Sequence, residues 1–130
     1  MRGRVGVGSG IAVLVGAVAL LAACGTPVAE RTPVVPVAGD PGAGHAAIIE
    51  AGCGACHRIP DVPNARSMVG PPLDSWPQRS FIAGTLTNSP DNLARWIADP
   101  QQIRPGTAMP DLDLDDETIA DIVAYLYTLD

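Results

Sequence analysis

The chain has 130 residues and a formal net charge of −6, so its length allows one ordinary domain at most. Its 8 basic residues are all arginine and face 14 acidic residues, an excess of negative charge that disfavours nucleic acid as a partner. With only 3 cysteines, a framework of structural disulfides is excluded as well.

The first 23 residues differ in kind from the rest. Arg2 and Arg4 precede an uncharged apolar run from Val5 to Ala23. A basic start, an apolar stretch and small residues before a cleavage site are typical of a secretory signal. We therefore expect residues 1–23 to be a signal peptide. An uncleaved membrane helix is the alternative, because the run is just long enough to span a bilayer.

The end of this run indicates how the exported part is held. Leu21-Ala22-Ala23-Cys24 resembles the lipobox of bacterial lipoproteins, in which the cysteine becomes the first residue and carries the lipid. The resemblance implies lipidation at Cys24. We expect the protein to be anchored on the periplasmic or extracytoplasmic face of a bacterial membrane.

Residues 24–43 contain mainly proline, glycine, alanine and valine. Such a composition cannot build a core and favours extended conformations. We expect a linker here, either a semi-rigid spacer or a tail without a spacing role, followed by a folded domain at 44–130. Without residues 1–23 the chain keeps 6 basic residues against its 14 acidic ones. That surface either docks onto a basic patch or only keeps the protein soluble.

Three helices are predicted in the folded domain. The first runs from His45 to about Cys56, with Ile48 and Ile49 about one turn before the cysteines. The second has Ser89 as its N-cap and a proline at its first position, and its apolar residues recur at helical spacing. They are Leu93, Trp96 and Ile97.

The third predicted helix has the clearest pattern. Acidic residues 115–117 cap and charge its start, and its apolar residues then recur at i, i+3, i+4 and i+7. They are Ile119, Ile122, Val123 and Leu126. No run alternates as a strand, and residues 58–88 and 100–114 are expected to be loops. The fold class is therefore all-α, with three main helices and long loops.

Such a domain lacks apolar material for its own interior. It has 1 phenylalanine, long loops and no disulfide network, and a chain this short would bury too little apolar surface alone. A bound group is therefore expected to fill the middle.

The motif Cys53-Gly-Ala-Cys56-His57 suggests which group. Cys-x-x-Cys-His is the attachment signature of c-type haem: two thiols one turn apart reach the two vinyl groups on one porphyrin edge, and the histidine ligates the iron. A thioredoxin-like dithiol would need a βαβ context, and a zinc site would need a fourth ligand. Neither is evident, so one covalent haem c is predicted.

The sixth ligand of the iron has to come from elsewhere in the chain. Met109 lies in a loop with prolines on both sides. Met68 follows His57 closely and suits packing or a surface position better, and His45 is expected to face solvent. Met109 is the predicted ligand, with Met68 as the alternative.

The order of these motifs resembles a class I cytochrome c over residues 44–130. The features that carry the resemblance are the haem motif, Gly70-Pro71-Pro72-Leu73, the segment from Pro100 to Met109, and Ala124-Tyr125-Leu126 in the last helix. The resemblance implies a small all-α fold whose first and last helices cross near the haem. At this crossing it implies Gly44, Ile48 and Tyr125.

The resemblance also assigns roles to single residues. The Pro71 carbonyl accepts a hydrogen bond from His57, and Trp96 lies beside the methionine ligand or simply packs in the core. Trp76 and Arg79 are candidates for binding the haem propionates. Ile48 replaces the usual aromatic residue, and the lysine-rich docking face of mitochondrial relatives is absent.

The function implied is the transfer of single electrons between respiratory complexes, without bond chemistry. A bc-type quinol-oxidising complex or a periplasmic dehydrogenase is the expected donor and a terminal oxidase the expected acceptor, since residues 89–110 are similar to cytochrome domains that act with haem-copper oxidases. The alternatives are a haem-based gas or redox sensor, a peroxidase-like enzyme with an open distal site, and a structural lipoprotein carrying a dithiol.

Overall fold

The computed structural model describes residues 37–130. The predicted signal peptide at 1–23, the lipidation site Cys24 and residues 25–36 of the predicted linker lie outside the described residues.

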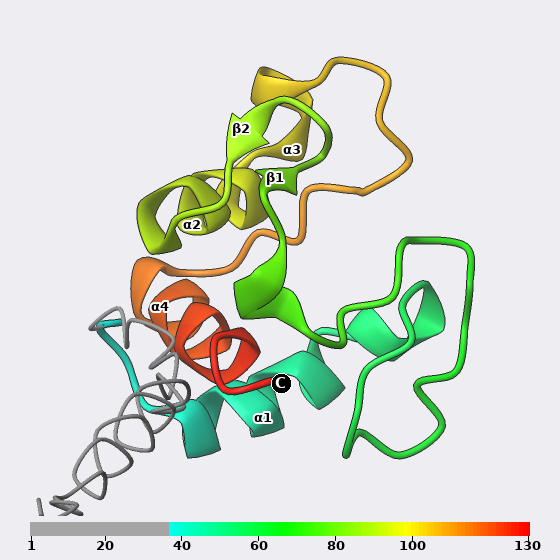
Figure 1. The fold of residues 1–130 in the computed structure, drawn as a ribbon, viewed down its shortest axis with the longest axis vertical. Helices are drawn as coiled ribbons and strands as arrows, with labels where there is room; N and C mark the ends of the chain where they lie inside the picture. The colour runs from blue at the N-terminus through cyan, green and yellow to red at the C-terminus, as the bar shows by residue number, and fades with distance from the viewer. Residues whose placement is uncertain (1–36) are drawn as a thin grey trace, which may run out of the picture. The chain divides into compact units, whose positions relative to one another are not determined.

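The described residues contain four α-helices and little strand (Figure 1). The helices are α1 (Pro41–Glu50), α2 (Pro90–Ala98), α3 (Pro100–Ile103) and α4 (Asp116–Leu126). Two short 3-10 helices lie at Cys53–Ala55 and Trp76–Gln78, and β1 (Phe81–Ile82) pairs antiparallel with β2 (Leu86–Thr87). The predicted all-α class is confirmed. Within residues 37–130 no helix has the length and apolarity that crossing a membrane requires.

The capping signals place two of the helices as predicted. The Ser89 hydroxyl accepts a hydrogen bond from the Asn92 N–H at 3.2 Å, and α2 begins at the following proline. Asp115 accepts from the Thr118 N–H at 2.8 Å at the start of α4. Each side chain satisfies a backbone N–H that has no partner within the helix.

The first and last helices cross closely, as expected. An ideal Cβ built on Gly44 would lie 1.9 Å from the Asp121 carbonyl oxygen of α4, so the two backbones can meet only where a side chain is missing. Next to this contact Ile48 is fully buried. At the start of α1, the Asp40 N–H donates to the Asp121 carboxylate at 2.7 Å.

The core lies between this crossing and α2. Its members come from residues 48–97 and 119–129, and the largest fully buried side chains are Ile48, Ile82, Leu93 and Pro100. Because α4 contributes buried residues from Ile119 to Leu126, it is the central element of the packing.

Three local predictions are wrong. Helix α1 begins at Pro41 rather than His45, because the Asp40 carboxylate caps Gly42 and Ala43, and it ends at Glu50, before the cysteines. The segment 81–87 forms a hairpin rather than a loop, although Ile82 is its only buried strand residue. Helix α3 adds one more turn where a loop was expected.

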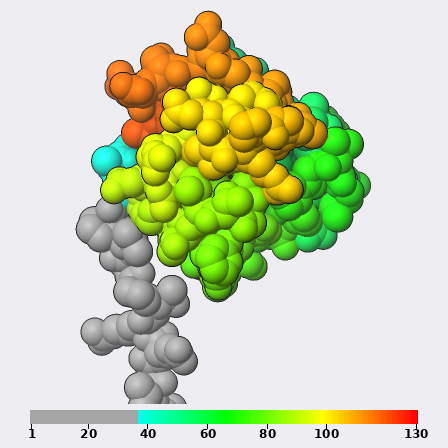
Figure 2. Space-filling model, turned by 90° about the horizontal axis from the view of Figure 1, so that it is seen from above, coloured from blue at the N-terminus to red at the C-terminus, as the bar shows by residue number. Residues whose placement is uncertain are grey.

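The region around α3 lies beside the hairpin. Figure 2 shows residues near 100, in yellow, next to residues near 80, in green, on one face. The Arg104 guanidinium donates to the Ala83 carbonyl at 2.9 Å and joins the two.

Candidate functional site

A cavity of about 360 Å³ lies among α1, α2, α4 and the loops, within the size range of small-molecule and cofactor sites. Much of its wall is apolar and includes Leu73, Leu93, Ile97, Leu112, Ile122 and Leu126. The predicted site residues Cys53, Cys56, His57, Pro71, Trp96 and Met109 all line it as well. The structure therefore brings together every predicted site residue that it describes.

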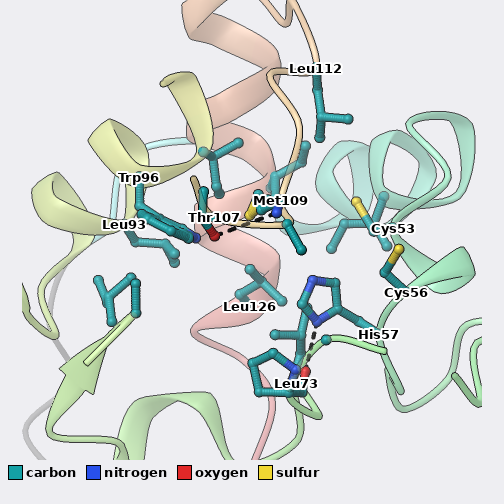
Figure 3. A pocket seen from close by; sticks show the side chains of 18 of the residues that line it. Cys53, Cys56, His57, Leu73, Leu93, Trp96, Thr107, Met109, Leu112 and Leu126 are labelled. Atoms are coloured by element: carbon teal, nitrogen blue, oxygen red, sulfur yellow. Dashed lines mark hydrogen bonds between the residues drawn. The ribbon is translucent and has the colours of Figure 1, made fainter. Parts of the chain in front are cut away.

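The cysteine motif forms a tight turn at one wall. The His57 and Cys56 N–H groups both donate to the Cys53 carbonyl, at 3.0 and 3.2 Å. The Gly70 N–H donates to the Cys56 carbonyl at 2.7 Å and ties the turn to the next segment. Figure 3 shows both sulfur atoms beside His57 at the cavity. The spacing of the motif thus places two thiols and one imidazole next to one another at the cavity.

The His57 ring is held in one orientation. Its Nδ1 lies 2.7 Å from the Pro71 carbonyl oxygen, and because a carbonyl only accepts, Nδ1 carries the proton. The other nitrogen, Nε2, is then the atom free to ligate a metal. A Cβ on Gly70 would lie 2.5 Å from the ring, so the glycine leaves the imidazole its space.

The Met109 side chain approaches the same space from another segment. Figure 3 shows it near Trp96 and Thr107, with His57 further along the cavity. Met109 packs partly buried against the core, whereas Met68 is 65% exposed and does not line the cavity. Of the two methionines considered from the sequence, only Met109 is placed to reach a group bound there.

His45, expected to face solvent, is half-buried. Its Nε2 lies 3.0 Å from the Asp61 carbonyl oxygen, and its ring packs edge-on against Tyr125 with centroids 5.1 Å apart. The Tyr125 hydroxyl donates to the Pro60 carbonyl at 2.9 Å. Both side chains therefore fasten the loop after the motif to the crossing of α1 and α4. The expected contact of Tyr125 with this crossing is confirmed.

Two buried donors lie at the cavity without partners. Trp76 Nε1 and Arg79 Nε have no hydrogen-bond partner among residues 37–130, and both residues line the cavity. The Arg79 guanidinium also donates to the Pro72 and Asp74 carbonyls and lies 5.3 Å from the Trp76 ring centroid. Unpaired buried donors are costly. A ligand with carboxylates, as haem has, would satisfy them.

The alternatives to haem receive no support from the side chains. Burial raises the pKa of the Cys53 thiol, which opposes the reactive thiolate of a dithiol oxidoreductase. Among residues 37–130 no three His, Cys, Asp or Glu side chains gather as metal ligands. An apolar cavity with two thiols, an oriented imidazole, a thioether and unpaired donors fits a c-type haem.

Some residues of the site have no signal in the sequence. Arg104 and Thr107 line the cavity, and Gln101 contacts the loop that carries Met109. Only the resemblance of the segment from Pro100 to Met109 to a methionine loop could have drawn attention to them.

Known proteins resemble this chain over the same region. Residues 43–130 match the family model described as Cytochrome c. The chain is 36% identical over 81 residues to cytochrome c oxidase subunit 2 of Alkalihalophilus pseudofirmus, which covers 62% of this chain and 23% of that protein. It is 33% identical over 99 residues to cytochrome c oxidase subunit 2 of Bacillus sp. strain PS3, and this match covers 72% of this chain and 28% of that protein. The chain thus spans about a quarter of the length of these relatives.

The matched region contains the cysteine motif, the helix crossing and the cavity. The small all-α fold is that of a class I cytochrome c, as the sequence predicted. Since the family model covers most of the chain, the protein belongs to the cytochrome c family, whose members transfer electrons by means of a c-type haem.

Proposed function

We propose that the protein is a carrier of single electrons with one covalently bound haem, and that it is not an enzyme. The observation that carries the proposal is that two thiols, one imidazole and one thioether line the same apolar cavity (Figure 3). Cys53 and Cys56 would form the thioether links, and His57 Nε2 and Met109 Sδ would ligate the iron. When bound, the haem supplies an iron that changes between two oxidation states one electron apart.

The protein side chains have three tasks in this proposal. The Pro71 carbonyl orients His57 and makes its ring more basic. The apolar wall, including Trp96, excludes water and leaves little to rearrange when the charge of the site changes. Trp76 Nε1 and Arg79 Nε would bind the acidic substituents of the haem, a role supported by their burial without a partner among residues 37–130.

The environment of the carrier is part of the proposal. We infer that residues 1–23 direct export and that a lipid on Cys24 anchors the protein on the extracytoplasmic face of a bacterial membrane. Residues 24–43 would then link the domain to its anchor and keep it close to its partners. A terminal oxidase is the proposed acceptor, supported by the relatives that are oxidase subunits. A bc-type complex or a periplasmic dehydrogenase is the proposed donor.

The axial ligand is tested by replacing each methionine in the exported protein. Met109→Ala should abolish the methionine-to-iron absorption band in the red. Once reduced, this variant should also bind carbon monoxide readily, whereas the parent should not. Met68→Ala is the matched control and should leave the band intact, because that side chain is exposed and lies outside the cavity.

Two results would contradict the proposal. Loss of the band in Met68→Ala but not in Met109→Ala would move the ligand to Met68. Ready binding of carbon monoxide by the parent would indicate an open distal site and favour a sensor or a peroxidase-like enzyme.

Covalent attachment has its own test. The parent should retain haem on a denaturing gel stained for peroxidase activity, and a variant with Cys53→Ser and Cys56→Ser together should not. A parent without stain would refute covalent attachment and favour a dithiol lipoprotein.

A further inference from the structure

The Gln101 side chain makes three hydrogen bonds to the loop that carries Met109. Its Nε2 donates to the Thr107 carbonyl at 2.9 Å and to the Met109 carbonyl at 3.1 Å. Its Oε1 accepts from the Gly106 N–H at 3.0 Å. Both amide protons and the amide oxygen are thus used, on three residues of one short segment.

The backbone of this loop has few other restraints near Met109. The Thr107 N–H donates to the Arg104 carbonyl at 3.1 Å. The Met109 N–H is 3.5 Å from the Thr107 hydroxyl, at the long limit for a hydrogen bond. The contact from Gln101 is therefore the shortest hydrogen bond that the structure records on the Met109 backbone.

Helix α3, which carries Gln101, is itself fixed in place. Pro100 at its start is almost completely buried, and the Asp99 carboxylate accepts from the Gln102 N–H at 2.8 Å. At its end, Arg104 donates to the Ala83 carbonyl of the hairpin. Because these contacts hold α3 from both ends, Gln101 extends from a rigid element to a loop that is otherwise weakly held.

We propose that Gln101 is a positioning residue for Met109: its amide holds the loop where the thioether reaches the iron. The inference rests on the proposed function, in which Met109 is the sixth ligand. A methionine side chain has several rotatable bonds and adapts easily, so the position of its backbone decides how long the sulfur stays at the metal. Gln101 acts on that position without lining the cavity.

Three variants of the full, haem-loaded protein test this role. Gln101→Ala removes all three hydrogen bonds. Gln101→Glu keeps an oxygen for the Gly106 N–H but places a carboxylate opposite two carbonyl oxygens. Gln102→Ala is the matched control, because Gln102 is the neighbouring glutamine, is also exposed, and makes no side-chain hydrogen bond within residues 37–130.

The first measurement is local and does not depend on the iron. Exchange of the Gly106 amide hydrogen should become faster in Gln101→Ala, whereas Gln101→Glu should retain part of the protection. The second is capture of carbon monoxide by the reduced protein, which reports release of the methionine. We expect capture of carbon monoxide to be about tenfold faster in Gln101→Ala, because a few exposed hydrogen bonds that hold the loop are lost. Gln101→Glu should also accelerate capture, with a weaker methionine band, and Gln102→Ala should match the parent in both measurements.

The outcomes separate the inference from the function on which it rests. If Gly106 exchange accelerates while the methionine band and carbon monoxide capture stay as in the parent, Gln101 braces the loop without positioning Met109, and the inference is wrong. Unchanged exchange in Gln101→Ala would also refute it. If the parent itself has no methionine band, Met109 is not the ligand, and both the proposed function and this inference are wrong.

Discussion

The two walls of the cavity are built in different ways. The wall that carries Cys53 and His57 is held by backbone hydrogen bonds, such as that from Leu73 N–H to the Arg58 carbonyl at 2.8 Å, and it continues directly from α1. The wall that carries Met109 is held largely by the side chains of Gln101 and Arg104, both of which are exposed.

This difference separates a rigid wall from one that can open. Backbone hydrogen bonds fix the chain itself and here continue from the helix crossing, whereas exposed side-chain hydrogen bonds compete with water and contribute little each. We therefore expect His57 to keep its position while the Met109 loop opens more often. The Gln101 variants above test the Met109 wall, and the predictions below test the first wall and the elements that support the cavity, from the largest expected effect to the smallest.

Gly44→Ala should have the largest effect, because it forces apart the two helices that support the first wall. The new Cβ would meet backbone atoms of Asp121 and Ile122, which cannot move without shifting α4. We expect the free energy of unfolding to fall by about 3 kcal/mol, measured by denaturant titration. Gly42→Ala is the control, because its Cβ would meet only the Asp40 carboxylate, at 3.1 Å. A similar loss in both variants would contradict the role of the crossing.

Gly70→Ala tests the first wall at the imidazole. The added methyl group would lie 2.5 Å from His57 Cε1 and 2.8 Å from Nδ1, so the ring has to turn away from the Pro71 carbonyl. We expect the free energy of unfolding to fall by about 2 kcal/mol. A smaller fraction of the purified protein should also carry haem, measured by the ratio of haem to protein. Met68→Ala, two positions away, 65% exposed and outside the cavity, should change neither quantity. Full loading of Gly70→Ala would show that the ring has room to move.

Two tyrosines of the C-terminal segment allow the first wall to be compared with the segment that carries Trp76 and Arg79. The Tyr125 hydroxyl donates to the Pro60 carbonyl in the first wall at 2.9 Å. The Tyr127 hydroxyl donates at 2.9 Å to the side chain of Asn88, which in turn donates to the carbonyls of Trp76 and Arg79. Tyr125→Phe and Tyr127→Phe should each lower the free energy of unfolding by about 1 kcal/mol, because each removes one hydrogen bond.

The two tyrosine variants should differ in where the structure opens. Amide exchange should become faster at Ile59 in Tyr125→Phe, because Ile59 N–H donates to Ala65 within the loop that Pro60 belongs to. In Tyr127→Phe it should become faster at Arg79, whose N–H donates to Trp76. The same exchange pattern in both variants would show that the two regions open together.

Asp115 at the start of α4 should have the smallest effect and the clearest dependence on pH. Hydrogen bonds from Thr118 hold the pKa of this carboxyl below its usual value of 3.8. The charged cap therefore stabilises the fold fully above about this pH, and its contribution is lost as the pH falls through the lower folded value. Asp115→Asn keeps the cap but removes the titration. Between about pH 5 and about pH 3, the range in which carboxyl groups titrate, the thermal unfolding midpoint of the variant should fall less than that of the parent. An identical fall in both proteins would contradict this role.

Local signals in the sequence predicted much of the fold. The starts of α2 and α4 follow from Ser89 and Asp115, because an N-cap acts on residues only two or three positions away. The start of α1 was missed although Asp40 is a cap of the same kind, since the surrounding proline and glycine indicated a linker. The hairpin at 81–87 was missed because each of its strands has only 2 residues, too few for a pattern of alternation.

The candidate site divides in the same way. Cys53, Cys56 and His57 are recognisable because their chemistry depends on a spacing of a few residues. The partnership of Met109 with Gln101, the contact of His45 with Asp61 and the unpaired donors of Trp76 and Arg79 depend on how loops pack. No periodic pattern records such packing, and only the resemblance to a family pointed to some of these residues.

The sequence alone determined the haem motif, the helical class and the caps, because each of these depends on neighbouring residues within one or two turns. Only the tertiary structure decided which methionine faces the cavity, how His57 is oriented by Pro71 and which side chain holds the Met109 loop. Those contacts join residues that are far apart in the chain or lie in irregular loops, and their geometry exists only after α1 and α4 have packed together.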